Sequence, residues 1–182
     1  MISRVVTVGG PPGSGKSTAC RRVAEVLGLT YTSAGQLFRA EARQRGLDLE
    51  AFGRYAEAHP EVDRTLDERV QALARPGALI EGRIQGALCR RHATPVHDVL
   101  VTATLDVRVQ RVAQRDHQSL EDARSAIVQR EASERHRYRR FYDLDIDTEP
   151  SDLTVDTTDL PPDDVAQRIV EFLRGRDAGP SR

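Results

Sequence analysis

The chain alternates between short apolar runs rich in β-branched residues and longer stretches in which apolar residues recur every three or four positions. The short runs predict β-strands at residues 4–8, 29–32, 78–81, 98–104 and 153–157. The longer stretches predict helices at residues 15–27, 34–45, 48–75, 106–115, 119–142 and 163–174. Strands that alternate with helices favour a parallel sheet covered by helices on both faces. We therefore expect an α/β fold.

Two regions are longer than a connection between neighbouring strands requires. Residues 34–75 insert helices between the second and third predicted strands, and residues 116–147 are polar and rich in arginine. We expect both regions to project above the edge of the sheet where ligands bind. At 182 residues, the chain is long enough for one sizeable core, so we expect a single domain over residues 1–182.

The composition narrows the class of protein. Hydrophobic residues make up 38% of the chain and charged residues 30%, with a formal net charge of -1. Such a chain suits a soluble globular protein, and it lacks the excess positive charge that general nucleic-acid binding requires. Cys20 and Cys89 lie far apart without metal-ligand spacing, which favours buried free thiols in a reducing compartment. With no apolar stretch of signal-peptide or membrane-span length, we expect a cytoplasmic protein that binds no membrane. We also expect a monomer.

The sequence GPPGSGKS, at residues 10–17, matches the phosphate-binding loop G-x-x-x-x-G-K-[ST] between a predicted strand and a predicted helix. Its glycines let the backbone curl so that N–H groups converge on an anion at the helix N-terminus. The Ser17 hydroxyl is in the position that binds Mg²⁺. The residues expected to bind ATP here are Gly10, Pro11, Pro12, Gly13, Ser14, Gly15, Lys16, Ser17 and Thr18.

Lys16 is the single lysine among the 27 lysine and arginine residues of the chain. A compact ammonium can reach between the β- and γ-phosphates as a point charge, whereas a planar guanidinium is bulkier and oriented differently. An arginine-rich chain therefore keeps a lysine where arginine would not substitute. We expect Lys16 to be catalytic.

The loop by itself does not separate a GTPase, a motor ATPase and a kinase. A guanine-reading N-K-x-D sequence is excluded because the chain has no second lysine, and the chain is short for a motor. Glu81 ends the third predicted strand, where a carboxylate can orient magnesium-bound water. Arg39 and Arg83 each follow the end of a strand, which makes them candidates for binding an acceptor phosphate. These features favour a small kinase.

Four further arginines lie in pairs on predicted helices. Arg130 and Arg137 are seven residues apart, and Arg111 and Arg115 are four apart, so each pair shares one helix face. In phosphoryl transfer such arginines neutralise the migrating charge. The alternative is an exposed helix with salt bridges, since EASERHRYRR mixes charges of both signs.

Several segments together resemble the short, type 2 cytidylate kinases, a family of nucleoside-monophosphate kinases. These segments are GPPGSGKST, SAGQLFR, HPEVDRTLDER, LIEGR, QREASERHRY and YDLDI, and the likeness extends to about Thr158. The resemblance implies a P-loop kinase with strand order 2-3-1-4-5, an acceptor-binding insert at 34–75 and a lid at 116–147. It also implies Mg²⁺- and ATP-dependent phosphorylation of CMP or dCMP.

The resemblance also implies roles for individual residues. Arg130 and Arg137 would be lid arginines that act in catalysis, and Arg115 would lie near the donor base, with Arg111 also on the ATP side. Ser17 and, through water, Glu81 would hold Mg²⁺. The residues that would bind the acceptor are Ser33, Gly35, Arg39, Arg83 and Asp63, the last by reading the cytosine edge.

Three segments depart from the usual pattern of the family. IQGAL stands where a small-residue turn ending in Trp is usual, Asp143 replaces a Gly, and EPSDLTVDTT lacks a Tyr. These changes affect the acceptor pocket and the lid hinge, so a kinase of another nucleotide or small metabolite is the first alternative. A nucleotide-binding module without catalysis is the second, but such a module needs no second anion site.

Overall fold

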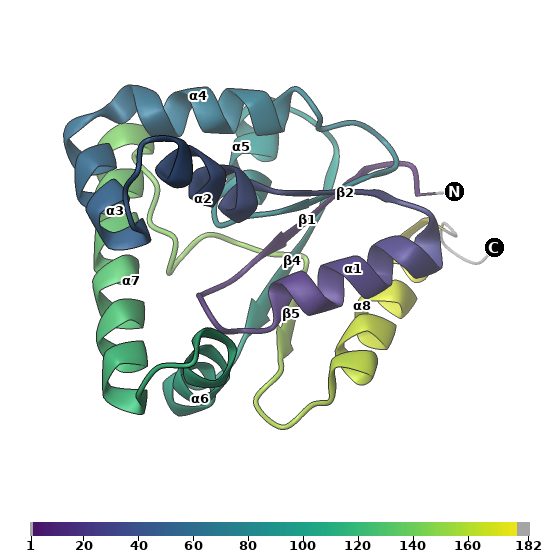
Figure 1. Cartoon of the computed structure of the whole chain (residues 1–182). Coiled ribbons are helices and arrows are strands. Elements are labelled where there is room, and N and C mark those ends of the chain that lie inside the picture. Colours follow the sequence, from purple (N-terminus) through teal and green to yellow (C-terminus); the bar gives the residue numbers. More distant parts are fainter. Residues whose placement is uncertain (1, 178–182) are drawn as a thin grey trace.

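The computed structural model describes residues 2–177 and contains a five-stranded parallel sheet of order β2-β3-β1-β4-β5 (Figure 1). Its strands are β1 (Val5–Gly9), β2 (Thr30–Ser33), β3 (Ala78–Glu81), β4 (Val96–Thr102) and β5 (Leu153–Asp156). Each strand runs parallel to its neighbours. The predicted α/β class and strand order are confirmed.

Helices cover both faces of the sheet. Helices α1 and α8 pack on one face, and α4 and α5 pack on the other (Figure 1). The helices are α1 (Lys16–Leu27), α2 (Ala34–Gln44), α3 (Leu49–Ala58), α4 (Pro60–Gln71), α5 (Gln85–Arg91), α6 (Leu105–Asp116), α7 (Leu120–Tyr142) and α8 (Pro162–Asp177). Within residues 2–177, none of these helices combines the length and the apolar character needed to cross a membrane.

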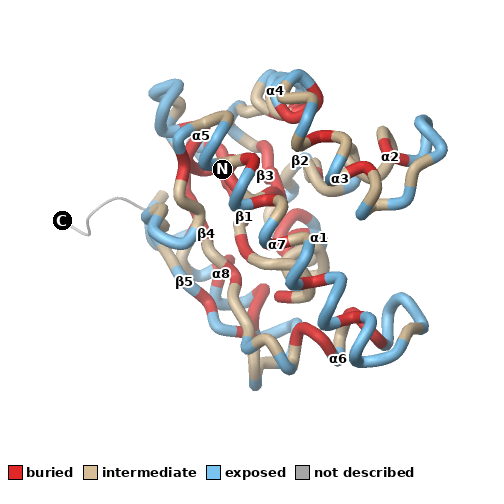
Figure 2. Tube along the Cα trace, turned by 90° about the vertical axis from the view of Figure 1, so that its left-hand side faces the viewer, coloured by how far each residue is buried: buried red, intermediate tan, exposed pale blue. Residues whose placement is uncertain are grey.

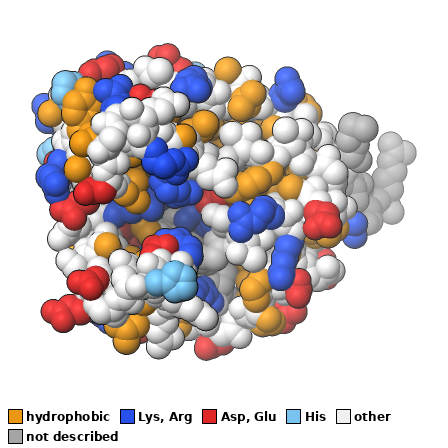
Figure 3. Space-filling model, viewed as in Figure 1, with side chains coloured by type: hydrophobic (Ala, Val, Ile, Leu, Met, Phe, Trp, Pro, Cys, Tyr) orange, Lys and Arg blue, Asp and Glu red, His pale blue; other side chains and the backbone are white. Residues whose placement is uncertain are grey.

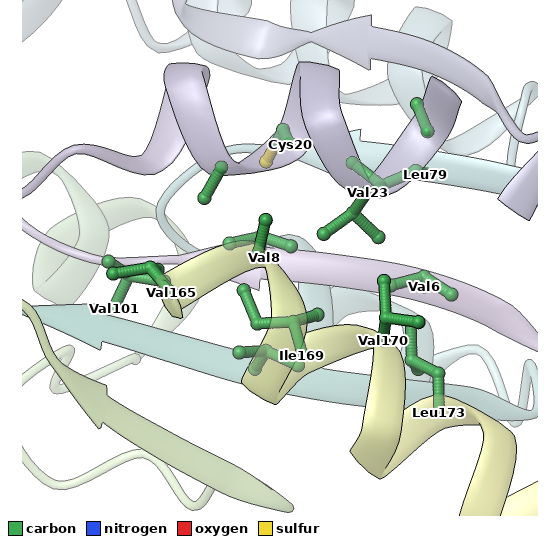
Figure 4. Close-up of a cluster of buried hydrophobic side chains, with 14 of the residues drawn as sticks. Val6, Val8, Cys20, Val23, Leu79, Val101, Val165, Ile169, Val170 and Leu173 are labelled. Atoms are coloured by element: carbon green, nitrogen blue, oxygen red, sulfur yellow. The ribbon is translucent and has the colours of Figure 1, made fainter. Parts of the chain in front are cut away.

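Packing on both faces of the sheet explains why the sequence of β1 is a nearly continuous apolar run. Val6 and Val8 point into the cluster beneath α1 and α8 (Figure 4). Val5 points to the opposite face, where it packs with Ile80 and with residues of α4 and α5. A parallel strand that is buried on both faces needs apolar side chains at consecutive positions. Figure 2 shows the buried residues concentrated along the strands and the helix sides that face them.

The prediction of one helical stretch over 48–75 is wrong, because the structure divides it into α3 and α4 at His59. His59 has φ -127° and ψ 78°, outside the helical region. It precedes Pro60, which disfavours helical geometry in the residue before it and opens the next helix at its own position. The insert at 34–75 therefore contains three helices joined by bends.

Helix α5 was missing from the sequence prediction. It is only seven residues long, and residues Gln85 to Cys89 are all buried, so it has no amphipathic period. Gly86 lets it approach β4 closely, since a Cβ there would lie 2.0 Å from Oδ2 of Asp98. The predicted state of the thiols is confirmed, because Cys20 and Cys89 are both buried and free.

Candidate active site

A cavity of about 1390 Å³ lies at the carboxyl ends of β1, β2 and β3, between the phosphate loop, α2, α3 and α7. Figure 3 shows lysine and arginine side chains gathered around a hollow in this face of the molecule. Parallel strands end at one edge of the sheet, and this common edge brings the distant motifs together. Predicted site residues on the cavity wall are Pro12, Gly13, Gly15, Lys16, Ser17, Thr18, Gly35, Arg39, Asp63, Glu81, Arg83, Arg111, Arg115, Arg130 and Arg137.

The remaining predicted site residues lie behind this wall and shape it. Gly10, with φ 141°, leaves no room for a side chain, because a Cβ there would lie 2.0 Å from the Val101 carbonyl oxygen. Ser14 is buried beneath the loop, and the Pro11 carbonyl faces the Lys16 side chain. Ser33 accepts a hydrogen bond from the Gln36 backbone N–H at 3.3 Å and so caps α2.

The loop presents free backbone donors at the N-terminus of α1. Gly15 is the N-cap, with φ 89° and no capping side chain. Within the described part of the chain, the N–H groups of Gly15, Lys16 and Ser17 donate to no backbone or side-chain acceptor. Unpaired N–H groups at a helix N-terminus suit an anion. The loop therefore fits the phosphate groups of a nucleotide.

Lys16 is held across its own loop. Its Nζ donates to the Pro11 carbonyl oxygen at 2.8 Å. Desolvation and, after it, the positive charge of Arg83 lower the pKa of its ammonium to about 7. An anion that replaces the carbonyl would favour the charged form.

Glu81 lies beside the phosphate loop because it pairs in register with Val8 of β1. Its Oε1 accepts a hydrogen bond from Ser17 Oγ at 2.8 Å, and its Oε2 accepts one from the hydroxyl of Tyr31. Desolvation, followed by this bond to Glu81, raises the pKa of Tyr31, so the phenol remains a donor. The hydroxyl and carboxylate oxygens form a hard oxygen donor set of the kind that Mg²⁺ prefers. Sequence analysis missed Tyr31.

Two further residues support the phosphate loop from outside the motif. Thr157, just after β5, donates from Oγ1 to the Ser14 carbonyl oxygen at 2.9 Å. Arg111 donates to the Thr157 hydroxyl at 2.9 Å and to its carbonyl oxygen at 2.7 Å. Arg108 donates to the Pro12 carbonyl oxygen at 3.3 Å. Sequence analysis missed Thr157 and Arg108, since neither belongs to a recognisable local pattern.

Arginines from three elements meet at the other end of the cavity. Glu134 of α7 contacts Nε of Arg83 at 2.7 Å and Nε of Arg130 at 2.8 Å. Desolvation alone would raise the pKa of Glu134, but Arg130 and Arg83 hold it at about 2. Arg39 of α2 lines the same cavity, and its pKa is lowered by desolvation and by the charge of Arg130. No sequence pattern predicted a role for Glu134.

Asp63 and Arg137 form an ion pair between α4 and α7. Both oxygens of Asp63 accept from Nη1 of Arg137, one of them at 2.5 Å. The two residues are 5% and 3% exposed, so the pair is deeply buried. The guanidinium also lies 5.1 Å from the ring centroid of Phe38. The predicted base-reading carboxylate and one predicted lid arginine are thus bound to each other in this conformation.

A polar network adjoins this ion pair. Asp67 accepts from Nε2 of Gln85 at 2.7 Å and from the Tyr142 hydroxyl at 2.6 Å. Desolvation raises the pKa of Asp67 to about 6. Gln85 belongs to the IQGAL segment that departs from the family pattern. Gln85, from the segment that departs from the family pattern, therefore lies in the wall of the cavity.

Comparison with known proteins identifies the family. A family model described as an AAA domain matches residues 9–145. A cytidylate kinase from Aeropyrum pernix is 43% identical over 171 residues, covering 93% of this chain and 98% of that protein. The chain belongs to the cytidylate kinase family. Another relative, the cytidylate kinase of Pyrococcus furiosus, is 40% identical over 88% of this chain and 83% of its own length.

Solved structures extend the likeness of this P-loop kinase fold beyond the cytidylate kinases. Shikimate kinase from Acinetobacter baumannii superposes with a TM-score of 0.61 at 20% identity, covering 95% of this chain and 94% of that one. Shikimate kinase from Aquifex aeolicus gives a TM-score of 0.58 at 15% identity, covering 96% and 99%. At such low identity, these neighbours establish the fold alone.

Proposed function

We propose that this member of the cytidylate kinase family transfers the γ-phosphoryl group of ATP to CMP or dCMP. The observation that carries the proposal is a single cavity with two sites for anions. Free N–H groups and Lys16 form one site, and Arg39 and Arg83 lie at the other. A protein that only binds ATP needs no second site. The relatives named cytidylate kinases at 39% to 43% identity support the choice of acceptor.

In the proposed reaction, an oxygen of the acceptor phosphate attacks the γ-phosphorus in line. A new P–O bond forms as the bond to the β,γ-bridging oxygen breaks, and ADP leaves with that oxygen. The protein supplies position and charge rather than covalent chemistry. Lys16 and the loop hold the donor phosphates, Arg39 and Arg83 hold the acceptor phosphate, and Arg130 faces the group in transit.

Ser17 and Glu81 would hold Mg²⁺, Glu81 through water. The ion would neutralise part of the negative charge of the donor phosphates. In the structure these two residues hydrogen-bond to each other, so binding would exchange that bond for contacts to the ion and its waters. Tyr31 would keep the Glu81 carboxylate oriented.

Residues 116–147 would act as a lid and residues 34–75 as the acceptor-binding insert. In the structure the two regions meet through the Asp63–Arg137 ion pair. In the proposed reaction, Asp63 would bind the cytosine edge and Arg137 the transferred phosphoryl group. Both roles require the acceptor to rearrange this ion pair.

An ADP-release assay across CMP, dCMP, UMP, AMP, GMP and several non-nucleotide alcohols tests the function. We expect ADP release with CMP or dCMP, abolished by excess chelator. ADP release with an alcohol metabolite but none of the monophosphates would keep the kinase chemistry and overturn the acceptor assignment.

A further inference from the structure

Glu134 is a buried carboxylate that the reaction described above does not use. It lies on α7 and is 4% exposed. Its two oxygens contact two arginines from different parts of the chain, Arg83 after β3 and Arg130 of α7 itself. One side chain thus joins an acceptor-binding arginine to an arginine of the proposed lid.

Both contacts use the same nitrogen of the guanidinium group. Arg83 and Arg130 each face Glu134 through Nε, at 2.7 and 2.8 Å. Their terminal nitrogens, Nη1 and Nη2, donate no hydrogen bond to another residue among residues 2–177. Both arginines line the cavity. Each therefore keeps two donors available to bind phosphate in a bidentate fork.

We infer that Glu134 is a positioning residue: it bridges Arg83 and Arg130 so that both guanidinium groups act together on the acceptor phosphate and the phosphoryl group in transit. This inference rests on the proposed function and adds a residue to it. Glu134 touches neither substrate in this role and acts only through the two arginines.

Electrostatics explains why such a bridge is needed. Arg83 and Arg130 carry like charges in one partly buried site, and like charges repel strongly where water is scarce. A carboxylate between them offsets that repulsion before any substrate arrives. The Arg83 contact is an ion pair without the alignment of a hydrogen bond, which leaves this guanidinium able to reorient toward a phosphate.

A different role for Glu134 would be that of an anion that the acceptor phosphate displaces. The two roles predict opposite effects on turnover. If Glu134 competes with phosphate, its loss removes an obstacle, so kcat is unchanged or rises. If Glu134 positions the arginines, its loss favours anion binding through the freed positive charge but lowers kcat, because the arginines lose their shared geometry.

The test compares Glu134→Gln with Glu131→Gln, per folded molecule. Glu131 is a second buried glutamate of α7, 8% exposed, which pairs with Arg108 at 2.6 Å rather than with Arg83 or Arg130. For Glu134→Gln we expect kcat to fall about tenfold or more, with an unchanged or lower KM for CMP. We also expect tighter binding of inorganic phosphate by calorimetry, a readout that needs no turnover. For Glu131→Gln we expect the KM for CMP of the wild type, because its partner Arg108 contacts the phosphate loop rather than the acceptor arginines.

Glu134→Asp supplies the second variant, because it keeps the charge and shortens the reach by one methylene. We expect its kcat to lie between those of the wild type and Glu134→Gln. A kcat at or above the wild-type value in Glu134→Gln overturns the inference. So does an equal loss of kcat in both glutamine variants, which would indicate a purely structural role. If the wild type fails to phosphorylate CMP, the proposed function fails, while the phosphate-binding comparison still decides whether Glu134 governs the two arginines.

Discussion

Lys16 is a functional residue that a contiguous sequence motif is enough to predict. Its role was predicted from its own loop, because the glycines, the helix and the lysine all lie within ten positions of one another. Tyr31, Thr157 and Glu134 were not found in this way. Tyr31 meets Glu81 across 50 positions, and Thr157 meets Ser14 across 143. Only the fold creates such contacts, so no short pattern signals them.

Replacing Lys16 with arginine should abolish most turnover although it conserves the charge. The ammonium is confined over its own loop, 2.8 Å from the Pro11 carbonyl oxygen, where a wider planar guanidinium cannot take the same position. We expect kcat with CMP to fall about 10²-fold or more, while the circular dichroism spectrum and the melting temperature remain close to wild type. Arg168→Lys, on the exposed side of α8, is the control and should keep full activity. Near-normal turnover in well-folded Lys16→Arg would contradict this explanation.

The single lysine also allows a direct titration. Protein labelled with ¹³C at lysine Cε should give one lysine signal, with a pKa of about 7 in the free protein. Bound ATP should raise this pKa, because its phosphate oxygens stabilise the ammonium. Nucleotide binding near pH 8 should therefore take up a proton, which calorimetry in buffers of different ionisation enthalpy measures. A free-protein pKa near the ordinary value of 10.5 would contradict the prediction.

The pH dependence of stability follows from the same group, with a definite sign. Between about pH 7 and 10.5 the unfolded chain holds the Lys16 proton that the folded protein has released. The contribution of Lys16 to the free energy of unfolding should therefore rise with pH in this window and be constant below it. Lys16→Met should remove this contribution. Chemical unfolding curves of the wild type and of Lys16→Met at pH 7 and pH 9 measure the difference. An identical pH dependence of the free energy of unfolding in the wild type and in Lys16→Met would contradict this prediction.

At the scale of helices and strands, periodic segments were predictable and interrupted segments were not. The five strands were found because each is a short apolar run, and the long helices because apolar residues recur along them every three or four positions. The break at His59 depends on a single proline, and α5 is buried without periodicity. The sequence of the lid segment, residues 116–147, is polar and rich in arginine. In the structure, Ala123 and Ile127 of α7 are buried in a cluster with α6.

This anchorage divides α7 into two parts that should respond differently to ligands. The first part packs through Ala123 and Ile127 against α6. The second, from Arg130 onward, lies beside the cavity, where Arg130 and Arg137 form ion pairs, and packs against α5 through Tyr138 and Tyr142. Hydrogen exchange should show residues 130–147 gaining strong protection with a bisubstrate analogue and weak protection with ATP alone, since the partners of the arginines are phosphates. Residues 120–128 should change less. Protection of the second part equal to that of the sheet in the free protein would rule out a lid.

For the whole molecule, the sheet edge brings together groups that are distant in sequence. The order β2-β3-β1-β4-β5 places the ends of β1 and β3 side by side, so the phosphate loop and Glu81 share one site. This arrangement was predicted from the family resemblance and is confirmed. The ion pair that joins α4 and α7 was not predicted, because it depends on how the insert and the lid segment fold toward each other.

The choice of acceptor is the property that depends on this whole arrangement. Cytosine carries an amino donor where uracil carries a carbonyl acceptor, so a carboxylate favours cytosine and repels uracil. Asp63 is the carboxylate assigned to this role. Its carboxylate would have to bind both Arg137 and the cytosine base. A buried site built for one hydrogen-bonding pattern rejects the other, because its polar atoms are left unpaired. We expect CMP or dCMP to exceed UMP by about tenfold or more in kcat/KM, which corresponds to about 1.4 kcal/mol.

Asp63→Asn tests the assignment, because it removes the charge and keeps the shape. It should narrow the ratio of CMP to UMP mainly by lowering kcat/KM for CMP. Asp67→Asn is the matched control on the same helix, since Asp67 is engaged by Gln85 and Tyr142 rather than by Arg137. If only Asp67→Asn narrows the ratio, the carboxylate that distinguishes cytosine lies one turn further along α4. The two variants thus place base recognition either on the ion pair that joins the insert to α7 or on the network around Gln85.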